Sequence, residues 1–253
     1  MKSALLCVSF GTSVDTARES ITAVENVMQQ AAPGLVFMRA FTSPTIRRIL
    51  RDRGEVVFSV EQALAQLCQW GFQQVIVQPT HVLYGYEYEK LRQEAEPWGR
   101  LIRDLRLGHP LLGTTQDIQA LAAVMSQACP RKKGRAIVLF GHGTDHYANA
   151  AYPALQLALQ LIGRRDMLVG TVEGWPSYED VSTQLKALGF SSVELVPLML
   201  VAGDHALKDM SGSEDSWKAR LEAEGYSVSC SLRGMGLIPG VQELYRRHLE
   251  AIL

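Results

Sequence analysis

The run A-L-L-C-V-S-F-G-T-S at residues 4–13 places a stretch of apolar residues directly before a glycine, and A-I-V-L-F-G-H-G at residues 136–143 does so again. A short apolar run that ends in a glycine turn is typical of a buried strand followed by a loop. Aligned on their phenylalanines, 130 residues apart, the two runs set Thr12 against His142. Each half of the chain is therefore expected to begin with a similar strand and loop.

A second pair of similar stretches lies further along each half. Residues 79–90 read P-T-H-V-L-Y-G-Y-E-Y-E-K, and residues 197–208 read P-L-M-L-V-A-G-D-H-A-L-K. The proline that opens each stretch, the glycine within it and the lysine that ends it match at a spacing of 118 residues. This alignment sets Glu87 against His205. Two blocks that recur in the same order predict a duplicated chain with two similar βαβ-rich halves.

Around these blocks, short β-branched runs alternate with longer amphipathic stretches. We expect strands at 3–10, 35–41, 74–79, 135–140, 167–172, 192–197 and 226–231. We expect helices at 13–31, 60–70, 87–104, 115–128, 147–162, 178–188, 215–224 and 240–252, with N-caps at Thr12 or Ser13, at Ser59 and at Ser177. This alternation predicts an α/β fold of two similar lobes, each a parallel sheet flanked by helices. The clearest linker is Lys132-Lys133-Gly134, so we place the lobes at residues 1–130 and 131–253.

Bulk composition narrows the classes of function. Hydrophobic residues make up 47% of the 253 residues and charged residues 20%, which supplies a globular core and excludes a disordered chain. The net charge of −1 offers no basic footprint for nucleic acid, and no apolar stretch approaches the roughly 18 residues of a membrane span. The first apolar run is too short for a secretory signal, and the four cysteines are scattered, so we expect a protein of the reducing cytoplasm.

The aligned positions bring metal-binding side chains to the ends of strands. Loops that follow parallel strands gather at one edge of the sheet, where ligands bind. We therefore expect Glu87, His142 and His205 to point into one cleft between the lobes, and two imidazoles with a carboxylate suit a first-row divalent ion. Glycines beside them, such as Gly85 and Gly143, would let a bulky flat ligand approach the backbone.

Other roles for nearby residues stay open at this stage. His142 and His146 could form an i, i+4 pair on one helical face, although Gly143 disfavours a helix there. His81 could contact the substrate or support the site, and Asp204 could orient the neighbouring imidazole or cap the following helix. The chain holds no G-x-G-x-x-G after its first strand, no Walker loop, no H-E-x-x-H and no G-x-S-x-G, which disfavours nucleotide binding and serine hydrolysis.

Six strings of the sequence together resemble one known family. They are V-S-F-G-T-S at 8–13, R-A-F-T-S at 39–43, H-V-L-Y-G-Y-E-Y-E-K at 81–90, G-H-G at 141–143, P-L-M-L-V-A-G-D-H-A at 197–206 and D-S-W-K at 215–218. In this order, from the first strand to beyond the last block, they resemble the anaerobic sirohydrochlorin cobaltochelatases, which belong to the class II chelatases. The resemblance implies two α/β lobes with the tetrapyrrole between them, cobalt as the inserted metal, and no organic cofactor.

The resemblance also implies roles for individual residues. His142, His205 and Glu87 would meet the metal, with His142 also the expected base and Glu87 able to shuttle protons. The residues expected to contact the tetrapyrrole are Phe10, Gly11, Thr12, Ser13, Tyr84, Gly85 and Arg39. Sirohydrochlorin is a polycarboxylate, so further cations could pair with it; these are Arg47 and Arg48, or Lys90 and Lys208.

The function predicted from the sequence is thus insertion of Co²⁺ into sirohydrochlorin with release of two protons, in anaerobic cobalamin biosynthesis. Two alternatives stay open. One is a chelatase for iron or nickel, since the affinity order of divalent metals does not select among them. The other is a non-catalytic haem- or tetrapyrrole-binding protein. A homo-oligomer is compatible with the sequence, and neither nucleic acid nor a membrane is expected as a partner.

Overall fold

The computed structural model describes residues 2–253, which form two compact units. The first holds the chain through Gly113 together with Gln242–Leu253, and the second holds Thr114–Val241. This division differs in two places from the boundary predicted after residue 130. Helix α5 (Thr115–Ala128) belongs to the second unit, where it packs against α6 (Ala151–Leu161), and the end of the chain returns to the first unit.

The last helix, α9 (Pro239–Glu250), is tied to the first unit by its second half. Tyr245 is fully buried, and its hydroxyl donates a hydrogen bond to the backbone oxygen of Thr80 at 2.7 Å. The ring of His248 lies against that of His109, with 4.0 Å between the ring centroids. These contacts join residues far apart in the chain, so a linker inferred from local composition could not reveal them.

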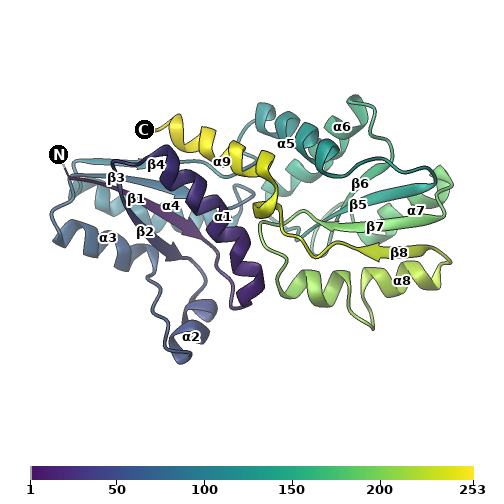
Figure 1. The fold of residues 1–253 in the computed structure, drawn as a ribbon, viewed down its shortest axis with the longest axis horizontal. Helices are drawn as coiled ribbons and strands as arrows, with labels where there is room; N and C mark the ends of the chain where they lie inside the picture. Colours follow the sequence, from purple (N-terminus) through teal and green to yellow (C-terminus); the bar gives the residue numbers. More distant parts are fainter. Residues whose placement is uncertain (1) are drawn as a thin grey trace. The chain divides into compact units, whose positions relative to one another are not determined.

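The first unit is built on a four-stranded sheet of order β2-β1-β3-β4 in which every pair is parallel (Figure 1). Its strands are β1 (Ser3–Ser9), β2 (Val36–Phe41), β3 (Gln74–Pro79) and β4 (Asp104–Leu107). Besides α9, its helices are α1 (Asp15–Ala31), α2 (Pro44–Asp52), α3 (Val60–Gln69), α4 (Tyr86–Ala95) and the 3-10 turn η1 (Glu96–Arg100). Because the strands are parallel, the loops after their carboxyl ends lie at one edge of the sheet.

The second unit repeats this plan with a sheet of order β6-β5-β7-β8, again parallel throughout. Its strands are β5 (Arg135–Gly141), β6 (Met167–Thr171), β7 (Ser192–Pro197) and β8 (Ser227–Cys230). Its other helices and turns are α7 (Tyr178–Leu188), α8 (Trp217–Ala223), η2 (Tyr147–Ala150), the π-helical turn η3 (Ala206–Met210) and η4 (Met235–Leu237). The repeated strand order confirms the predicted duplication and the predicted fold of two parallel sheets flanked by helices.

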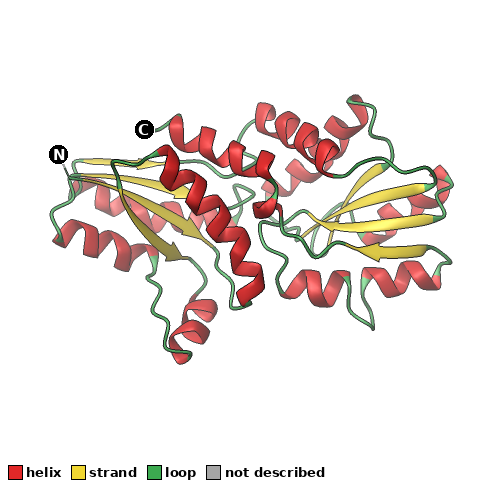
Figure 2. Cartoon of the chain, viewed as in Figure 1, coloured by secondary structure: helices red, strands yellow, loops and turns green. Residues whose placement is uncertain are grey.

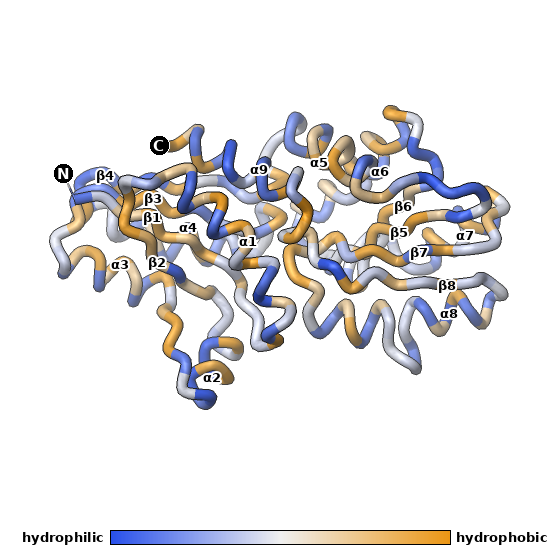
Figure 3. The backbone as a smooth tube through the Cα atoms, viewed as in Figure 1, coloured by the Kyte–Doolittle hydropathy of each residue, from blue (hydrophilic) through white to orange (hydrophobic). Residues whose placement is uncertain are grey.

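Continuous apolar strands form the core of each unit. Residues 4–8 of β1 and 136–140 of β5 are no more than 1% exposed. Helices lie on both faces of each sheet (Figure 2), which is why the central strands are apolar throughout rather than alternately polar. Figure 3 shows this pattern as hydrophobic strands beside helices that alternate between hydrophobic and hydrophilic residues. Among residues 2–253, no helix is both long and apolar enough to cross a membrane.

Two elements of the first unit were not predicted. The expected helix over 87–104 ends at Ala95, and strand β4 begins at Asp104, where its four half-buried residues pair with β3. Helix α2 begins at Pro44 after Ser43, whose hydroxyl accepts a hydrogen bond from the backbone of Ile46. Both elements are short, so neither carries a periodic pattern long enough to be recognised in the sequence.

Two of the three predicted helix N-caps are confirmed and one is not. Ser59 and Ser177 are confirmed as N-caps, and each forms a reciprocal capping box with the residue three positions later. The prediction of Thr12 or Ser13 as the cap of the first helix was wrong, because α1 begins at Asp15. The Thr12 hydroxyl instead accepts a hydrogen bond from the backbone nitrogen of Val14 at 3.1 Å and so shapes the loop before the helix.

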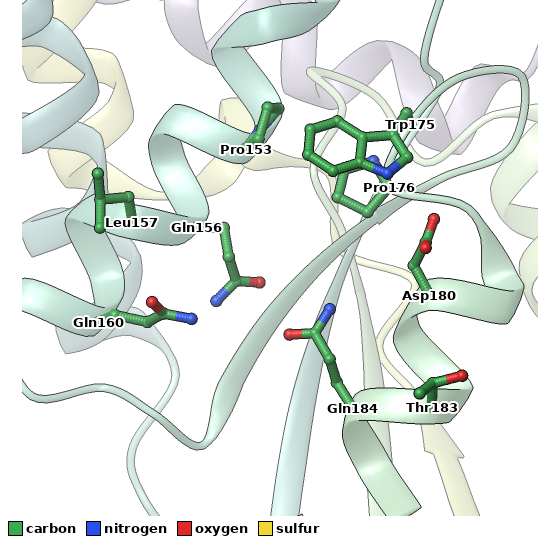
Figure 4. Close-up of a pocket in the computed structure, with 9 residues that line it drawn as sticks. All are labelled: Pro153, Gln156, Leu157, Gln160, Trp175, Pro176, Asp180, Thr183 and Gln184. Carbon is green, nitrogen blue, oxygen red and sulfur yellow. The ribbon is translucent and has the colours of Figure 1, made fainter. Parts of the chain in front are cut away.

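The outer edge of β6 is closed by a side chain rather than by another strand. The Gln156 amide accepts a hydrogen bond from the backbone nitrogen of Val169 at 2.7 Å and donates one to the backbone oxygen of Met167 at 3.0 Å. A cavity of about 410 Å³ lies here between α6 and α7, and Gln156 reaches into it from α6 (Figure 4). Its lining is Pro153, Gln156, Leu157, Gln160, Trp175, Pro176, Asp180, Thr183 and Gln184.

We predict that Gln156→Leu lowers the free energy of unfolding by about 3 kcal/mol, because a buried donor and a buried acceptor of β6 then lose their partners. The measurement is unfolding in urea. Gln160→Leu is the matched control, since Gln160 lies one turn along α6 and is exposed. Equal stability of the two variants would contradict the role assigned to the Gln156 amide.

Candidate metal site

His142 lies in the loop that directly follows β5. The backbone oxygen of His142 accepts a hydrogen bond from the backbone nitrogen of Glu173 at 2.8 Å, and the nitrogen of Gly143 points at the hydroxyl of Tyr152 at 3.4 Å. Gly143 has a φ of +81°, and a Cβ there would lie 2.5 Å from the backbone nitrogen of Gly174. The glycine is therefore required by its positive φ and by the close approach of the Gly174 backbone.

His205 follows β7 and stands immediately before the π-helical turn Ala206–Met210. Its Nδ1 lies 2.6 Å from Oδ2 of Asp209, four residues later. A π-helical turn inside helical structure is rare and is frequent at functional sites. The turn leaves the opposite ring nitrogen, Nε2, directed away from Asp209.

The two imidazoles face each other through their Nε2 atoms, which are 3.1 Å apart. The rings are edge-to-face, with centroids 4.4 Å apart and an interplanar angle of 85°. Nδ1 of His142 lies 2.9 Å from the backbone oxygen of Gly143, and Nδ1 of His205 faces a carboxylate. Both partners only accept hydrogen bonds, so in each neutral ring Nδ1 carries the proton and Nε2 carries a lone pair.

The two Nε2 atoms are within hydrogen-bond distance, so a proton on one of the rings, or a cation in its place, can join them. In zinc sites the distance from an imidazole nitrogen to the metal ion is about 2.0–2.1 Å. Two nitrogens bound to one ion at a tetrahedral angle therefore lie about 3.4 Å apart. The observed 3.1 Å between the Nε2 atoms of His142 and His205 is close to this spacing. The pair can therefore hold a first-row metal ion with little movement of either ring.

Glu87 lies in the first turn of α4, in the first unit. Its Oε2 is buried and has no hydrogen-bond partner among residues 2–253. A buried carboxylate oxygen without a donor is costly to maintain unless a proton or a cation occupies it. Glu87 is thus available for a cation, and its meeting with the histidines of the second unit stays a prediction.

The strand registers correct the predicted alignment of the two halves. Val8 pairs with Pro79 as Phe140 pairs with Pro197, so equivalent residues of β1 and β5 are 132 positions apart rather than 130. The counterpart of His142 is therefore Phe10, not Thr12. Gly11 and Gly143 confirm this register, because both have positive φ, +99° and +81°.

Phe10 is half exposed at 48%, although it stands directly after a buried strand. The second block keeps its predicted spacing of 118. The backbone nitrogens of Glu89 and Leu207 donate to the oxygens of Gly85 and Gly203, which are themselves 118 residues apart. Glu87 therefore does correspond to His205. The first half carries an exposed aromatic ring and a carboxylate where the second half carries two imidazoles.

The remaining predicted tetrapyrrole contacts have varied surroundings. Gly11 is buried, and a Cβ there would lie 2.6 Å from the ring of Phe41. Gly85, by contrast, borders open space, which leaves room for a ligand. The backbone oxygen of Ser13 accepts a hydrogen bond from the Arg53 side chain at 2.6 Å. Tyr84 packs edge-on against Tyr88, with ring centroids 4.8 Å apart.

Arg39, the predicted partner for a substrate carboxylate, is already engaged. Its Nε lies 2.8 Å from Oε1 of Glu25, and its second nitrogen pairs with the other carboxylate oxygen. Glu25 is almost fully buried. Arg39 therefore balances a buried charge within the first unit, and a contact with substrate stays a prediction.

Two alternatives from the sequence are settled by local geometry. The helical pair of His142 and His146, which Gly143 disfavoured, is excluded: the first lies in a loop, and the second is the N-cap of η2, where it accepts from the backbone nitrogen of Ala148 at 3.1 Å. Asp204 pairs with Lys208 at 3.8 Å. The carboxylate that reaches His205 is Asp209, which sequence reasoning missed, although its i+4 spacing was a visible signal.

His81 is unusual among the described histidines because both of its ring nitrogens are buried without a hydrogen-bond partner. The residue as a whole is only partly buried, so the exposed part is not its polar edge. Burial of the nitrogens lowers the pKa of His81 to about 4. The backbone oxygen of His81 accepts from the nitrogen of Leu111 at 2.9 Å, which holds the loop in place.

Comparison with known proteins places these features in context. The model of the cobalt chelatase (CbiK) family matches residues 3–253. A sirohydrochlorin cobaltochelatase of Salmonella typhimurium is 38% identical over 257 residues, covering 100% of this chain and 97% of that protein. The sirohydrochlorin cobaltochelatase CbiKC of Nitratidesulfovibrio vulgaris is 31% identical over 255 residues, covering 99% and 90%. The structure of SirB from Bacillus subtilis with Fe³⁺ has a TM-score of 0.69 at 17% identity, covering 100% of this chain and 96% of that one.

We predict that acid destabilises the fold through His81. Its folded pKa of about 4 lies below the ordinary value of about 6.5, so between these values the unfolded chain binds the proton more readily. Stability should therefore fall as the pH is lowered from about 6.5 to about 4, by about 3 kcal/mol in total from this residue. Urea unfolding at several pH values should show that His81→Leu loses less stability over this range than the parent chain. Parallel curves for the two proteins would rule His81 out as the cause.

Proposed function

The chain belongs to the CbiK cobalt chelatase family, and on this basis we propose that it inserts Co²⁺ into sirohydrochlorin with release of two protons. The observation that carries the proposal is the pair of facing Nε2 atoms of His142 and His205, 3.1 Å apart. Such a pair binds a divalent cation and can also accept a proton, the two operations that insertion requires. Cobalt is the substrate of this reaction rather than a resident cofactor.

The proposed reaction divides the work among three side chains. His142 and His205 hold the incoming ion, and Glu87 is the third ligand, whose negative charge offsets part of the charge of the metal. The buried, unpartnered Oε2 of Glu87 supports this role. Two pyrrole N–H protons must leave as the metal enters the macrocycle. His142 is the proposed acceptor of the first, at its Nε2 once the ion has left that nitrogen for the macrocycle, and the Glu87 carboxylate is the proposed acceptor of the second.

The proposed binding of the macrocycle draws on the first unit. Phe10 is an exposed apolar ring at the position equivalent to a metal-binding histidine, and a flat tetrapyrrole can pack against such a ring. For the substrate carboxylates, Arg47 and Arg48 of α2 are better candidates than Arg39, because the charge of Arg39 is balanced by Glu25. A cytoplasmic location and self-association stay predictions of the sequence.

The proposal is tested by mixing the purified protein with sirohydrochlorin and with Co²⁺, Fe²⁺ or Ni²⁺ in turn, without oxygen, while following the absorption spectrum. Repeated turnover that is fastest with cobalt is the expected result. Faster turnover with iron or nickel would indicate that this metal, and not cobalt, is the physiological substrate. Binding of one tetrapyrrole per chain without turnover would indicate a carrier rather than a chelatase.

We predict that His142→Ala lowers the rate of insertion by at least about 100-fold, since it removes both a ligand and a base. Glu87→Gln should lower the rate by about 10- to 100-fold, since the shape is kept and the charge is lost. The melting temperature of His142→Ala should stay close to that of the parent chain, because the His142 imidazole is partly exposed. Near-normal turnover in His142→Ala would remove this residue from the mechanism.

We predict that Phe10→Ala raises KM for sirohydrochlorin by about 3- to 10-fold, the range expected for loss of one aromatic packing contact. The affinity for cobalt should not change. Trp175→Ala is the matched control, because Trp175 is a similarly exposed aromatic residue beside the cavity of Figure 4. If both variants raise KM alike, the effect does not arise from a specific contact at Phe10.

A further inference from the structure

The two facing imidazoles have unequal partners on their far sides. Nδ1 of His205 lies 2.6 Å from a carboxylate oxygen of Asp209, a short, charge-assisted hydrogen bond. Nδ1 of His142 has only the neutral backbone oxygen of Gly143 at 2.9 Å, and the nearest carboxylate oxygen, that of Glu173, is 3.8 Å away. The contact of His205 with Asp209 is thus a hydrogen bond to a full negative charge, whereas Glu173 is too far from His142 for a hydrogen bond.

We propose that Asp209 is a positioning residue that fixes the tautomer of His205 and makes it the stronger of the two imidazole ligands. A carboxylate that accepts the proton of one ring nitrogen keeps the opposite nitrogen unprotonated and increases its electron density. Asp209 therefore prepares Nε2 of His205 for the ion, while His142 binds it less tightly. This proposal rests on the proposed role of His205 as a cobalt ligand.

The neighbouring carboxylate does not serve this purpose. Asp204 precedes His205 directly, but its side chain is 68% exposed and pairs with Lys208. Asp209 is less exposed, at 43%, and reaches the ring from the following turn. The two aspartates thus form a matched pair, both close to His205 and only one in contact with the imidazole.

The duplication supplies an independent argument. At the spacing of 118 residues that relates Glu87 to His205, the counterpart of Asp209 is Leu91, which is fully buried. A carboxylate beside Glu87 would repel it, whereas a carboxylate beside an imidazole attracts the ring proton. The acidic residue is present only in the half in which the aligned ligand is a histidine, as an orienting role requires.

The test compares Asp209→Ala, Asp209→Asn and Asp209→Glu with the control Asp204→Asn in the intact chain. Calorimetric titration with Co²⁺ should show affinity lower by about 10- to 100-fold in Asp209→Ala and Asp209→Asn, partial recovery in Asp209→Glu, and no change in Asp204→Asn. KM for cobalt should rise in parallel, while KM for sirohydrochlorin and the melting temperature stay constant.

A spectroscopic measurement separates positioning from general support of the fold. Nitrogen-15 NMR of the metal-free protein at alkaline pH should show His205 protonated on Nδ1 in the parent chain, and a mixture of both tautomers in Asp209→Ala and Asp209→Asn. Cobalt affinity within about twofold of the parent, with the tautomer unchanged, would overturn the proposal. The variant His205→Ala distinguishes a failure of the Asp209 proposal from a failure of the proposed cobalt-binding function. If it binds cobalt as the parent does, His205 is not a ligand; if it loses affinity while Asp209→Ala does not, only the role of Asp209 is wrong.

Discussion

The close approach of two ring nitrogens is the constraint on which the rest of this site depends. The fold holds the Nε2 atoms of His142 and His205 face to face, 3.1 Å apart, although the two residues are far apart in the chain. The rigidity comes from neighbouring strands. β5 and β7 are paired along their length, and the backbone nitrogen of Leu198 donates to the oxygen of Phe140 at 2.7 Å, just where both strands end. The two histidine loops therefore start from one fixed point.

The same backbone plan supports different chemistry in the two halves. In the first unit the equivalent hydrogen bond joins Thr80 to Val8, and the equivalent loops present Phe10 and Glu87. The sheets keep their order and register while the side chains at the strand ends differ. A scaffold whose stability lies in buried apolar strands leaves its loop residues free to change, because they contribute little to the core. This separation explains how one unit can hold an imidazole pair and the other an aromatic ring.

The sequence was sufficient for the fold class, because apolar runs of strand length alternate with amphipathic helices and recur in the same order. It was also sufficient to single out His142 and His205, since both follow strands within the repeated blocks. It misplaced the counterpart of His142 by two residues, because Phe10 and Phe140 match in identity while the positive-φ glycines, which set the register, are Gly11 and Gly143. The domain boundary and the contact of His205 with Asp209 depend on tertiary packing and on side-chain orientation, which periodicity does not encode.

The closure of β6 by Gln156 has a consequence for association between chains. An open strand edge presents unpaired backbone groups that can template the addition of a strand from another molecule. In β6 a single amide occupies the groups of Met167 and Val169, so that part of the edge offers neither donor nor acceptor to a neighbour. The sheet is thus protected by one side chain at a point where a long insertion or an extra strand would otherwise be needed. Resistance to strand addition at this edge therefore depends on Gln156, a residue outside the candidate metal site.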